Sequence, residues 1–101
     1  MLRWYKPIPL TALRVADVPD RPGVYVLLGD PDDISSALKI APARSLRDMY
    51  KREQAGSSDP HGPQPRGVMF AETWADAEEA ARLIAAYRRV HGRPPPLNSQ
   101  Y

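Results

Sequence analysis

The stretch Arg21–Gly29, with the sequence RPGVYVLLG, decides how the rest of the chain is organised. Pro22 fixes its own backbone angle and Gly23 tolerates a positive φ, so the pair predicts a tight turn. The run that follows, Val24–Leu28, is apolar and rich in β-branched and aromatic residues. Such a run is typical of a central strand that is buried on both faces. Its one polar side-chain atom is the hydroxyl of Tyr25, which is therefore the first candidate functional group.

The pattern of apolar residues around this strand predicts an α+β fold, with a three-stranded antiparallel sheet flanked by helices. Two further strands are expected at residues 34–41, where Pro42 ends the strand, and at residues 67–72. A polar turn at residues 29–33 joins the first two strands, and its shortness makes them antiparallel. Helices are expected at residues 46–54 and 74–91.

Capping residues and apolar stripes support both helices. Ser45 and Asp48 have the spacing of a capping box, and Thr73 is expected to cap the second helix, which Gly92 ends. The first helix carries an inner stripe of Leu46, Met49 and Tyr50. The inner face expected for the second helix consists of Ala77, Ala80, Ala81, Ile84 and Tyr87.

The remaining segments complete a single expected domain over residues 1–101. Residues 1–20 predict an extended arm or an edge strand, with one or two helical turns at 11–18 after Thr11. Residues 55–66, rich in Gly, Ser and Pro, predict a long, mobile loop. Residues 93–101 predict a Pro-rich tail that either crosses the sheet or binds a partner. Trp4 and Tyr5 either cover a small core or stack on a base.

Composition excludes several classes of protein. The chain has no cysteine and only two histidines, which removes disulfides, thiolate zinc sites and histidine metal clusters. No apolar stretch reaches the length of a membrane span, and no signal peptide is evident, so we expect a cytoplasmic protein without membrane contact. The aspartates at 30, 32 and 33 are expected to form a polar hairpin turn, with metal binding as the alternative. No metal ligand or cofactor is assigned.

Basic side chains are concentrated in two places, although the formal net charge is only +2. The arginines between residues 82 and 93 lie at the end of the long helix, where they match its dipole. The second group has two open interpretations, a phosphate-contacting surface or a solvated helix face. It comprises Lys39, Arg44, Arg47, Lys51 and Arg52.

Three motifs make the chain resemble the GIY-YIG nuclease family. Gly23-Val24-Tyr25 is similar to the family's first motif, residues 43–47 (ARSLR) to the stretch that opens its helix, and residues 95–98 (PPLN) to its closing motif. The resemblance covers about residues 19–98 and implies a bacterial or phage-like protein with the fold expected above. Family chemistry implies a glutamate that holds a divalent metal, a tyrosine that positions or deprotonates water, and an arginine that neutralises the phosphate.

An alignment on Ser45-Leu46-Arg47 retains only part of this machinery. The family's second tyrosine, motif glycine, catalytic arginine and glutamate fall on Lys39, Ala41, Met49 and Ala85 or Ala86, respectively. Residues 80–90 contain no carboxylate, so the resemblance implies a fold without the usual catalytic groups. Tyr25 is the candidate remnant of the site. Its hydroxyl either contacts water or phosphate, or its ring packs in the core under the long helix.

Three functional hypotheses follow. The first is a catalytically degenerate GIY-YIG-like domain that binds DNA or RNA through the second basic group or assists a protein partner that does so, with enzyme activity left open. The alternative is an active metal-dependent DNA endonuclease with relocated ligands, which would use Mg²⁺. The third is a structural or protein-interaction module. The oligomeric state is left open.

Overall fold

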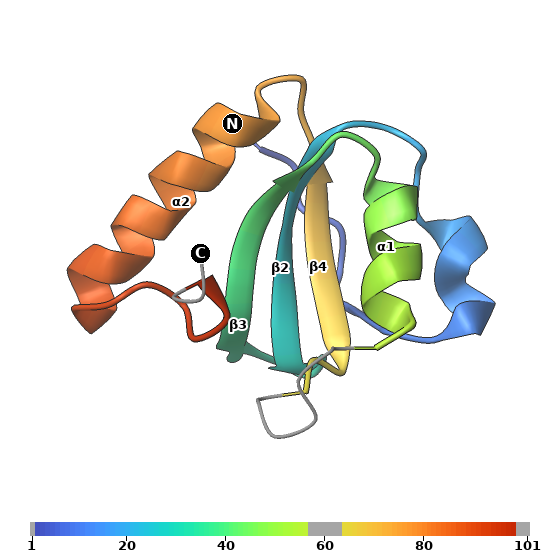
Figure 1. Ribbon diagram of the computed structural model, residues 1–101, viewed down its shortest axis with the longest axis horizontal. Helices are drawn as coiled ribbons and strands as arrows, with labels where there is room; N and C mark the ends of the chain where they lie inside the picture. The colour runs from blue at the N-terminus through green and yellow to red at the C-terminus, as the bar shows by residue number, and fades with distance from the viewer. Residues whose placement is uncertain (1, 57–63, 99–101) are drawn as a thin grey trace.

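The computed structural model describes residues 2–56 and 64–98 and contains one sheet with a helix on each side (Figure 1). The strands follow the order β1-β4-β2-β3 across the sheet, and every neighbouring pair is antiparallel. The α+β class is confirmed, but the prediction of three strands is wrong because the described chain forms four. The elements are β1 (Ile8–Pro9), the 3-10 helix η1 (Ala12–Asp17), β2 (Gly23–Asp30), β3 (Asp33–Ala43), α1 (Leu46–Gln54), β4 (Gly67–Glu72) and α2 (Asp76–His91).

The additional strand, β1, comes from the N-terminal arm. It pairs with the start of β4, and Trp4 forms a separate bridge to Ala71 at the other end of that strand. Prolines are tolerated in β1 because an edge strand needs hydrogen bonds on one side only. The buried hydroxyl of Tyr50 lies 2.7 Å from the carbonyl oxygen of Pro9 and accepts the N–H of Thr11 at 2.9 Å. The arm is therefore an edge strand tied to α1.

The predicted central strand is confirmed, because β2 lies between β3 and β4 and residues 23–28 are all buried. Successive side chains of β2 alternate between two hydrophobic clusters. Tyr25 and Leu27 belong to the cluster on the α1 side. Val24 and Val26 belong to the cluster on the α2 side. The one polar side chain of the strand thus packs beneath α1, and the prediction that its ring lies under the long helix is wrong.

The two helices use their apolar stripes to different degrees. In α1 the predicted stripe of Leu46, Met49 and Tyr50 is fully buried. In α2 the predicted inner face is only partly correct, since Ala77 and Ala81 are exposed. The helix contacts the sheet through Ala80, Ile84 and Tyr87, which were predicted, and through Leu83, which was not.

Gly23 has a different role from the one predicted. Its φ is not in the left-handed region, so the turn does not depend on that conformational freedom. A Cβ atom at this position would instead lie 2.3 Å from the carbonyl oxygen of Ala71 and 2.8 Å from the Cδ1 of Leu46. The glycine is required because β4 and α1 both approach the backbone of β2 too closely for a side chain.

The exposed edge of β3 is covered by the C-terminal segment. Pro42, predicted to end this strand, lies inside it and pairs with Val24, which an edge strand permits. The side-chain amide of Asn98 accepts the N–H of Ile40 at 2.8 Å and donates to its carbonyl at 2.9 Å. Pro95 is buried. The described part of the tail thus runs along the edge strand and does not cross the sheet as predicted.

Helix ends follow local hydrogen bonding. Ser45 caps α1 as predicted, by accepting the N–H of Asp48 at 3.2 Å. Thr73 does not cap α2, because its hydroxyl accepts the N–H of Ala75 at 3.1 Å, which delays the helix to Asp76. Gly92 ends α2 with φ of 76°, as predicted. The short helix after Thr11 is present as η1, without a side-chain cap. Most of the loop predicted at 55–66 lies outside the described residues.

The close approach at Gly23 predicts a large loss of stability in Gly23→Ala. The added methyl group must displace the β4 backbone or Leu46, which we expect to lower the free energy of unfolding by about 3 kcal/mol. Gly29→Ala is the matched control, because the nearest atoms to its added Cβ are 3.7 Å away. Urea denaturation measures both variants, and equal stabilities of the two would contradict the packing described here.

Candidate functional site

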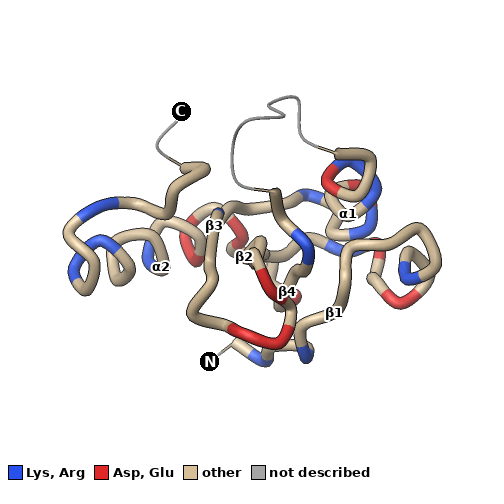
Figure 2. Tube along the Cα trace, turned by 90° about the horizontal axis from the view of Figure 1, so that it is seen from below, with Lys and Arg blue, Asp and Glu red and all other residues tan. Residues whose placement is uncertain are grey.

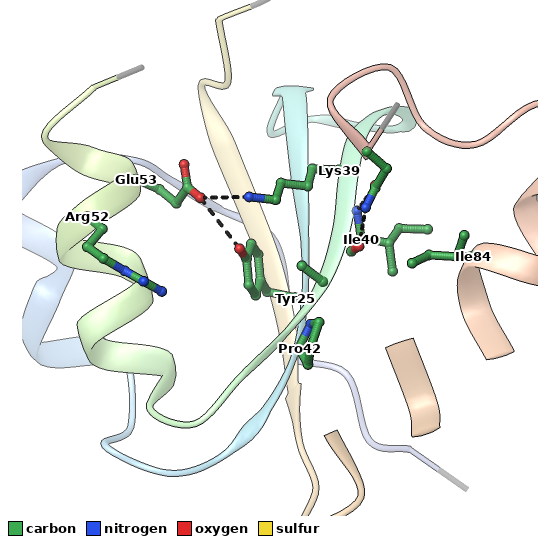
Figure 3. A pocket seen from close by; sticks show the side chains of 9 residues that line it. Tyr25, Lys39, Ile40, Pro42, Arg52, Glu53 and Ile84 are labelled. Carbon is green, nitrogen blue, oxygen red and sulfur yellow. Dashed lines mark hydrogen bonds and ion pairs between the residues drawn. The ribbon is translucent and has the colours of Figure 1, made fainter. Parts of the chain in front are cut away.

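An open cleft of about 540 Å³ lies beside the edge strand β3 (Figure 3). The end of α1 forms one wall, and Ile84 of α2 and Asn98 of the tail border the other side. Strand β3 supplies the floor through residues 39–42, and Tyr25 of β2 reaches the cleft from the neighbouring strand. The complete lining is Tyr25, Lys39, Ile40, Ala41, Pro42, Arg52, Glu53, Ile84 and Asn98.

Strand register brings Tyr25 and Lys39 onto the same face of the sheet. Tyr25 is opposite Ala41 and Leu27 is opposite Lys39, and both β2 residues face α1. The small side chain of Ala41 leaves space beside the phenol ring. The ring of Tyr25 is 3% exposed, and its hydroxyl points toward Glu53 at the end of α1 (Figure 3). Tyr25 is thus a core residue with a polar end at the cleft, and contact of its hydroxyl with water or phosphate stays a prediction.

Glu53 connects the polar groups of the cleft. Its Oε2 lies 3.5 Å from the hydroxyl of Tyr25 and 3.5 Å from the Nζ of Lys39. Both ion-pair side chains are shielded, with 14% exposure for Lys39 and 22% for Glu53. The ammonium group of Lys39 also lies 5.9 Å from the centroid of the Tyr25 ring, within the range of a cation–π contact. The three side chains form one unit, which we call the Tyr25–Lys39–Glu53 cluster.

Glu53 was not identified as a site residue from the sequence. A usable signal was present in the helix pattern. Glu53 follows Met49 by four residues and Leu46 by seven, so it continues the buried stripe of α1 toward the sheet. A carboxylate in an otherwise apolar stripe indicates a buried or functional contact.

The surroundings of Tyr25 keep its phenol protonated. Burial raises the pKa of Tyr25 above the usual value of 10.0 and is the largest influence. The negative charge of Glu53 also raises this pKa, whereas the charge and hydrogen bond of Lys39 and the charge of Arg52 lower it. The cleft therefore presents a neutral hydroxyl at neutral pH. This hydroxyl is better suited to hydrogen bonding than to accepting a proton as a base.

The five predicted nucleic-acid-binding residues are distributed over different environments. Lys39 and Arg52 line the cleft. Lys51 and Arg44 are exposed, on α1 and in the connection that precedes it. Arg47 is partly buried, and its Nε donates to the carbonyl of Val18 at 2.9 Å, so it also ties α1 to the segment after η1. Figure 2 shows Lys and Arg gathered along α1, away from the acidic β2–β3 hairpin.

The positions that the resemblance relates to catalysis are divided in the same way. Lys39 and Ala41 lie at the cleft with Tyr25, and so does Asn98 of the closing motif. Met49, where the catalytic arginine is expected, is fully buried and cannot contact a ligand. Ala85 and Ala86 are exposed on α2 and carry no functional group. The cleft therefore assembles a tyrosine, a lysine and an asparagine at these positions, without a carboxylate from α2.

The described residues offer little to a metal ion. No group of three or more His, Asp or Glu side chains within residues 2–56 and 64–98 is arranged to hold one. In the β2–β3 hairpin, Asp30 accepts the N–H of Asp32 and Asp33 accepts the N–H of Ser35, each at 2.9 Å. The aspartates thus form the polar turn that the sequence predicts. His61, the histidine of the loop, lies outside the described residues.

Comparisons with models of protein families, with curated proteins and with solved structures found no match for this chain. Neither α-helix in the described part of the chain is long and apolar enough to cross a membrane.

The raised pKa of Tyr25 predicts a pH-dependent loss of stability in alkali. Because the folded-state pKa exceeds the unfolded one, the neutral phenol stabilises the fold fully below about pH 10, and this contribution is lost as the pH rises through the folded pKa. We expect the wild type to lose stability relative to Tyr25→Phe in that range, measured by urea denaturation. The phenolate absorbance that the wild type has and Tyr25→Phe lacks should titrate with a midpoint above 10.0.

The neighbouring charges provide matched controls for this titration. Glu53→Gln should lower the midpoint of Tyr25, and Lys39→Met should raise it, because the two charges act in opposite directions. A midpoint that is unchanged in both variants, or that lies below 10.0 in the wild type, would contradict the described cluster.

Proposed function

We propose that this chain is a catalytically degenerate GIY-YIG-like domain that binds nucleic acid through the cleft beside β3. One observation carries the proposal: Lys39, Arg52 and the hydroxyl of Tyr25 converge on a single open cleft. Lys51 of α1 and Arg44, in the connection before this helix, are exposed and add positive charge around α1. A nucleic-acid strand on this surface could be the chain's own ligand or one that it holds for a processing partner.

The order of elements supports the family part of the proposal. A central strand of PGVY type is flanked on both sides by antiparallel strands, and a helix follows the first hairpin. The third of these strands is followed by the long helix and by a tail whose Asn98 returns to the sheet. The resemblance implies this arrangement, to which β1 is an addition at the edge.

The chemistry of the cleft suits phosphate groups. Arginine offers several donors in a planar fork, and lysine offers a mobile point charge. Glu53 neutralises part of this charge and holds Lys39 against the wall. Arg52, which has no ion-pair partner among residues 2–56 and 64–98, supplies the positive end of the site. The hydroxyl of Tyr25 donates to Glu53, and its oxygen can still accept a hydrogen bond from a sugar hydroxyl.

The expected catalytic positions lack the side chains that hydrolysis needs, which favours binding without turnover. A phosphodiesterase of the implied class needs charge stabilisation on the phosphate from both a metal and an arginine. The position expected for the arginine is the buried Met49, and the position expected for the glutamate is an alanine on α2. The retained surface therefore supports recognition better than hydrolysis.

Removal of the exposed charges tests the proposal. We expect the triple variant Arg44→Ala, Lys51→Ala, Arg52→Ala to bind DNA or RNA roughly tenfold more weakly at low salt, because up to three phosphate contacts are lost. The slope of log affinity against log salt should decrease by about 3. Fluorescence anisotropy with a labelled oligonucleotide measures both quantities.

A variant that removes the same charge from the end of α2, at Arg88, Arg89 and Arg93, is the control. The control variant should bind almost as the wild type does. If the wild type has no affinity for DNA or RNA at low salt, the proposal fails and a structural or protein-interaction role is favoured. Equal weakening by both triple variants would also contradict a site at this cleft.

The second candidate is an active metal-dependent DNA endonuclease with relocated ligands, which the contact of Glu53 with Tyr25 brings into consideration. Mg²⁺ does not fit this arrangement well. The ammonium group of Lys39 already pairs with the carboxylate, and Mg²⁺ prefers several oxygen ligands. No reaction step through a metal is therefore derived.

We accordingly expect no nicking of supercoiled plasmid by the wild-type protein in Mg²⁺ or Mn²⁺. Gel electrophoresis after long incubation measures this, with Glu53→Gln and Tyr25→Phe as matched variants. Nicking by the wild type that both variants abolish would establish the endonuclease instead. Nicking that neither variant alters would indicate a contaminating nuclease.

A further inference from the structure

A second surface, separate from the cleft, lies where β4 ends. Two hollows of about 520 Å³ and about 100 Å³ share Glu72 as a common wall. Trp4, Tyr5 and Arg3 line the larger hollow. The smaller one is lined by Arg21, Pro22, Thr73 and Trp74. We call the two together the aromatic groove.

Trp74 is the most unusual residue of this groove. Its side chain is 83% exposed, although its neighbours hold the backbone firmly. The N–H of Thr73 donates to the carbonyl of Pro22 at 3.1 Å, and the Thr73 hydroxyl accepts the N–H of Ala75. A large indole that adds nothing to the core, on a fixed backbone, is typical of a binding contact rather than of packing.

Tyr5 supplies a second fixed ring. It stacks on Phe70 with ring centroids 4.7 Å apart, and its hydroxyl donates to Glu72 at 2.5 Å. Tyr5 remains 42% exposed although its ring stacks on Phe70. Glu72 also pairs with the Nε of Arg21 at 3.5 Å, so one carboxylate orients both a ring and a cation.

Charge selects the class of ligand. Arg3 and Arg21 contribute two positive side chains to the groove, and Glu72 contributes one negative side chain, so an anionic ligand is favoured. Exposed aromatic rings together with arginines form the combination that binds single-stranded nucleic acid, in which unpaired bases stack and phosphates contact the cations. Proline-rich peptides also use aromatic grooves, but they lack the negative charge.

The groove and the cleft lie at related positions on the sheet. Glu72, Gly23 and Ala43 form one row across β4, β2 and β3, which spans about 10 Å. Arg21 and Arg44 come from the loops at this end of the sheet, where α1 and α2 also begin (Figure 1). Arg21 and Arg44 are thus two basic side chains at the end of the sheet that carries the aromatic groove.

We propose that the aromatic groove is a stacking site for unpaired bases of single-stranded nucleic acid, with Trp74 and Tyr5 as the stacking rings and Arg21 and Arg3 as the phosphate contacts. This inference rests on the proposed nucleic-acid binding and specifies its ligand as unpaired. The cleft contributes sequence-independent phosphate contacts, whereas the groove requires bases.

Three fluorescein-labelled ligands test the proposal by anisotropy with the full chain: a 12-nucleotide thymidine oligomer, an abasic oligomer of equal length, and the corresponding duplex. Trp74→Ala and Tyr5→Ala should each weaken binding of the thymidine oligomer by at least about fivefold, the lower end for loss of one stacked base. Neither should alter binding of the abasic oligomer, and Tyr5→Phe, which keeps the ring, should bind as the wild type does. The thymidine oligomer should also quench indole fluorescence of the wild type more than that of Trp74→Ala.

Leu13→Ala is the matched control, because Leu13 is an exposed apolar residue of η1. Thermal unfolding of each variant checks that it is folded. Equal affinity of the wild type for the thymidine and abasic oligomers, unchanged by Trp74→Ala, would overturn the groove and leave the proposed function intact. Absence of binding to all three ligands would overturn both. Quenching of Trp74 by a decaproline peptide, with no response to the thymidine oligomer, would replace nucleic acid with a peptide as the ligand of the groove.

Discussion

The burial of β2 on both faces is the constraint on which the rest of the structure depends. Its apolar side chains alternate between two clusters, so each face of the sheet must be covered by a separate element. Gly23 lets β4 and α1 approach the start of this strand without a gap. The edges of the sheet are protected in turn, by the short, proline-flanked β1 on one side and by Asn98 of the tail on the other.

The same constraint produces the candidate site. A strand that is buried on both faces can present a polar group only where a neighbouring side chain is small, and Ala41 provides that space beside Tyr25. Glu53 then reaches the phenol from the last turn of α1, and Lys39 balances its charge. A carboxylate shielded from water to this degree would be costly without such partners. The polar cluster is consequently part of the packing of α1 and also the wall of a cleft.

Local patterns predicted much of the fold but little of the site. The central strand, the strand at β4, α1 with its Ser45 cap and the αL stop at Gly92 each have a short-range signal, and all are present. Strand β1 was not counted among the predicted strands because its prolines weaken the sequence pattern of a strand. Its pairing with β4 depends on the folded sheet and has no local signal in the sequence. Glu53 was missed because its role depends on strand register, which brings Lys39 and Tyr25 to it from other elements. Trp74 was assigned to a helix, whereas the hydroxyl of Thr73 keeps it before the helix and exposed.

We propose that nucleic acid binds at the cleft beside β3. The most direct test is an NMR titration of the isotope-labelled protein with an unlabelled oligonucleotide, followed by the amide chemical shifts. The account predicts that the largest changes occur at residues 39–42 of β3 and 51–53 of α1 and saturate with a salt-dependent affinity. Changes confined to the β2–β3 hairpin or to the end of α2, or no changes at low salt, would contradict it.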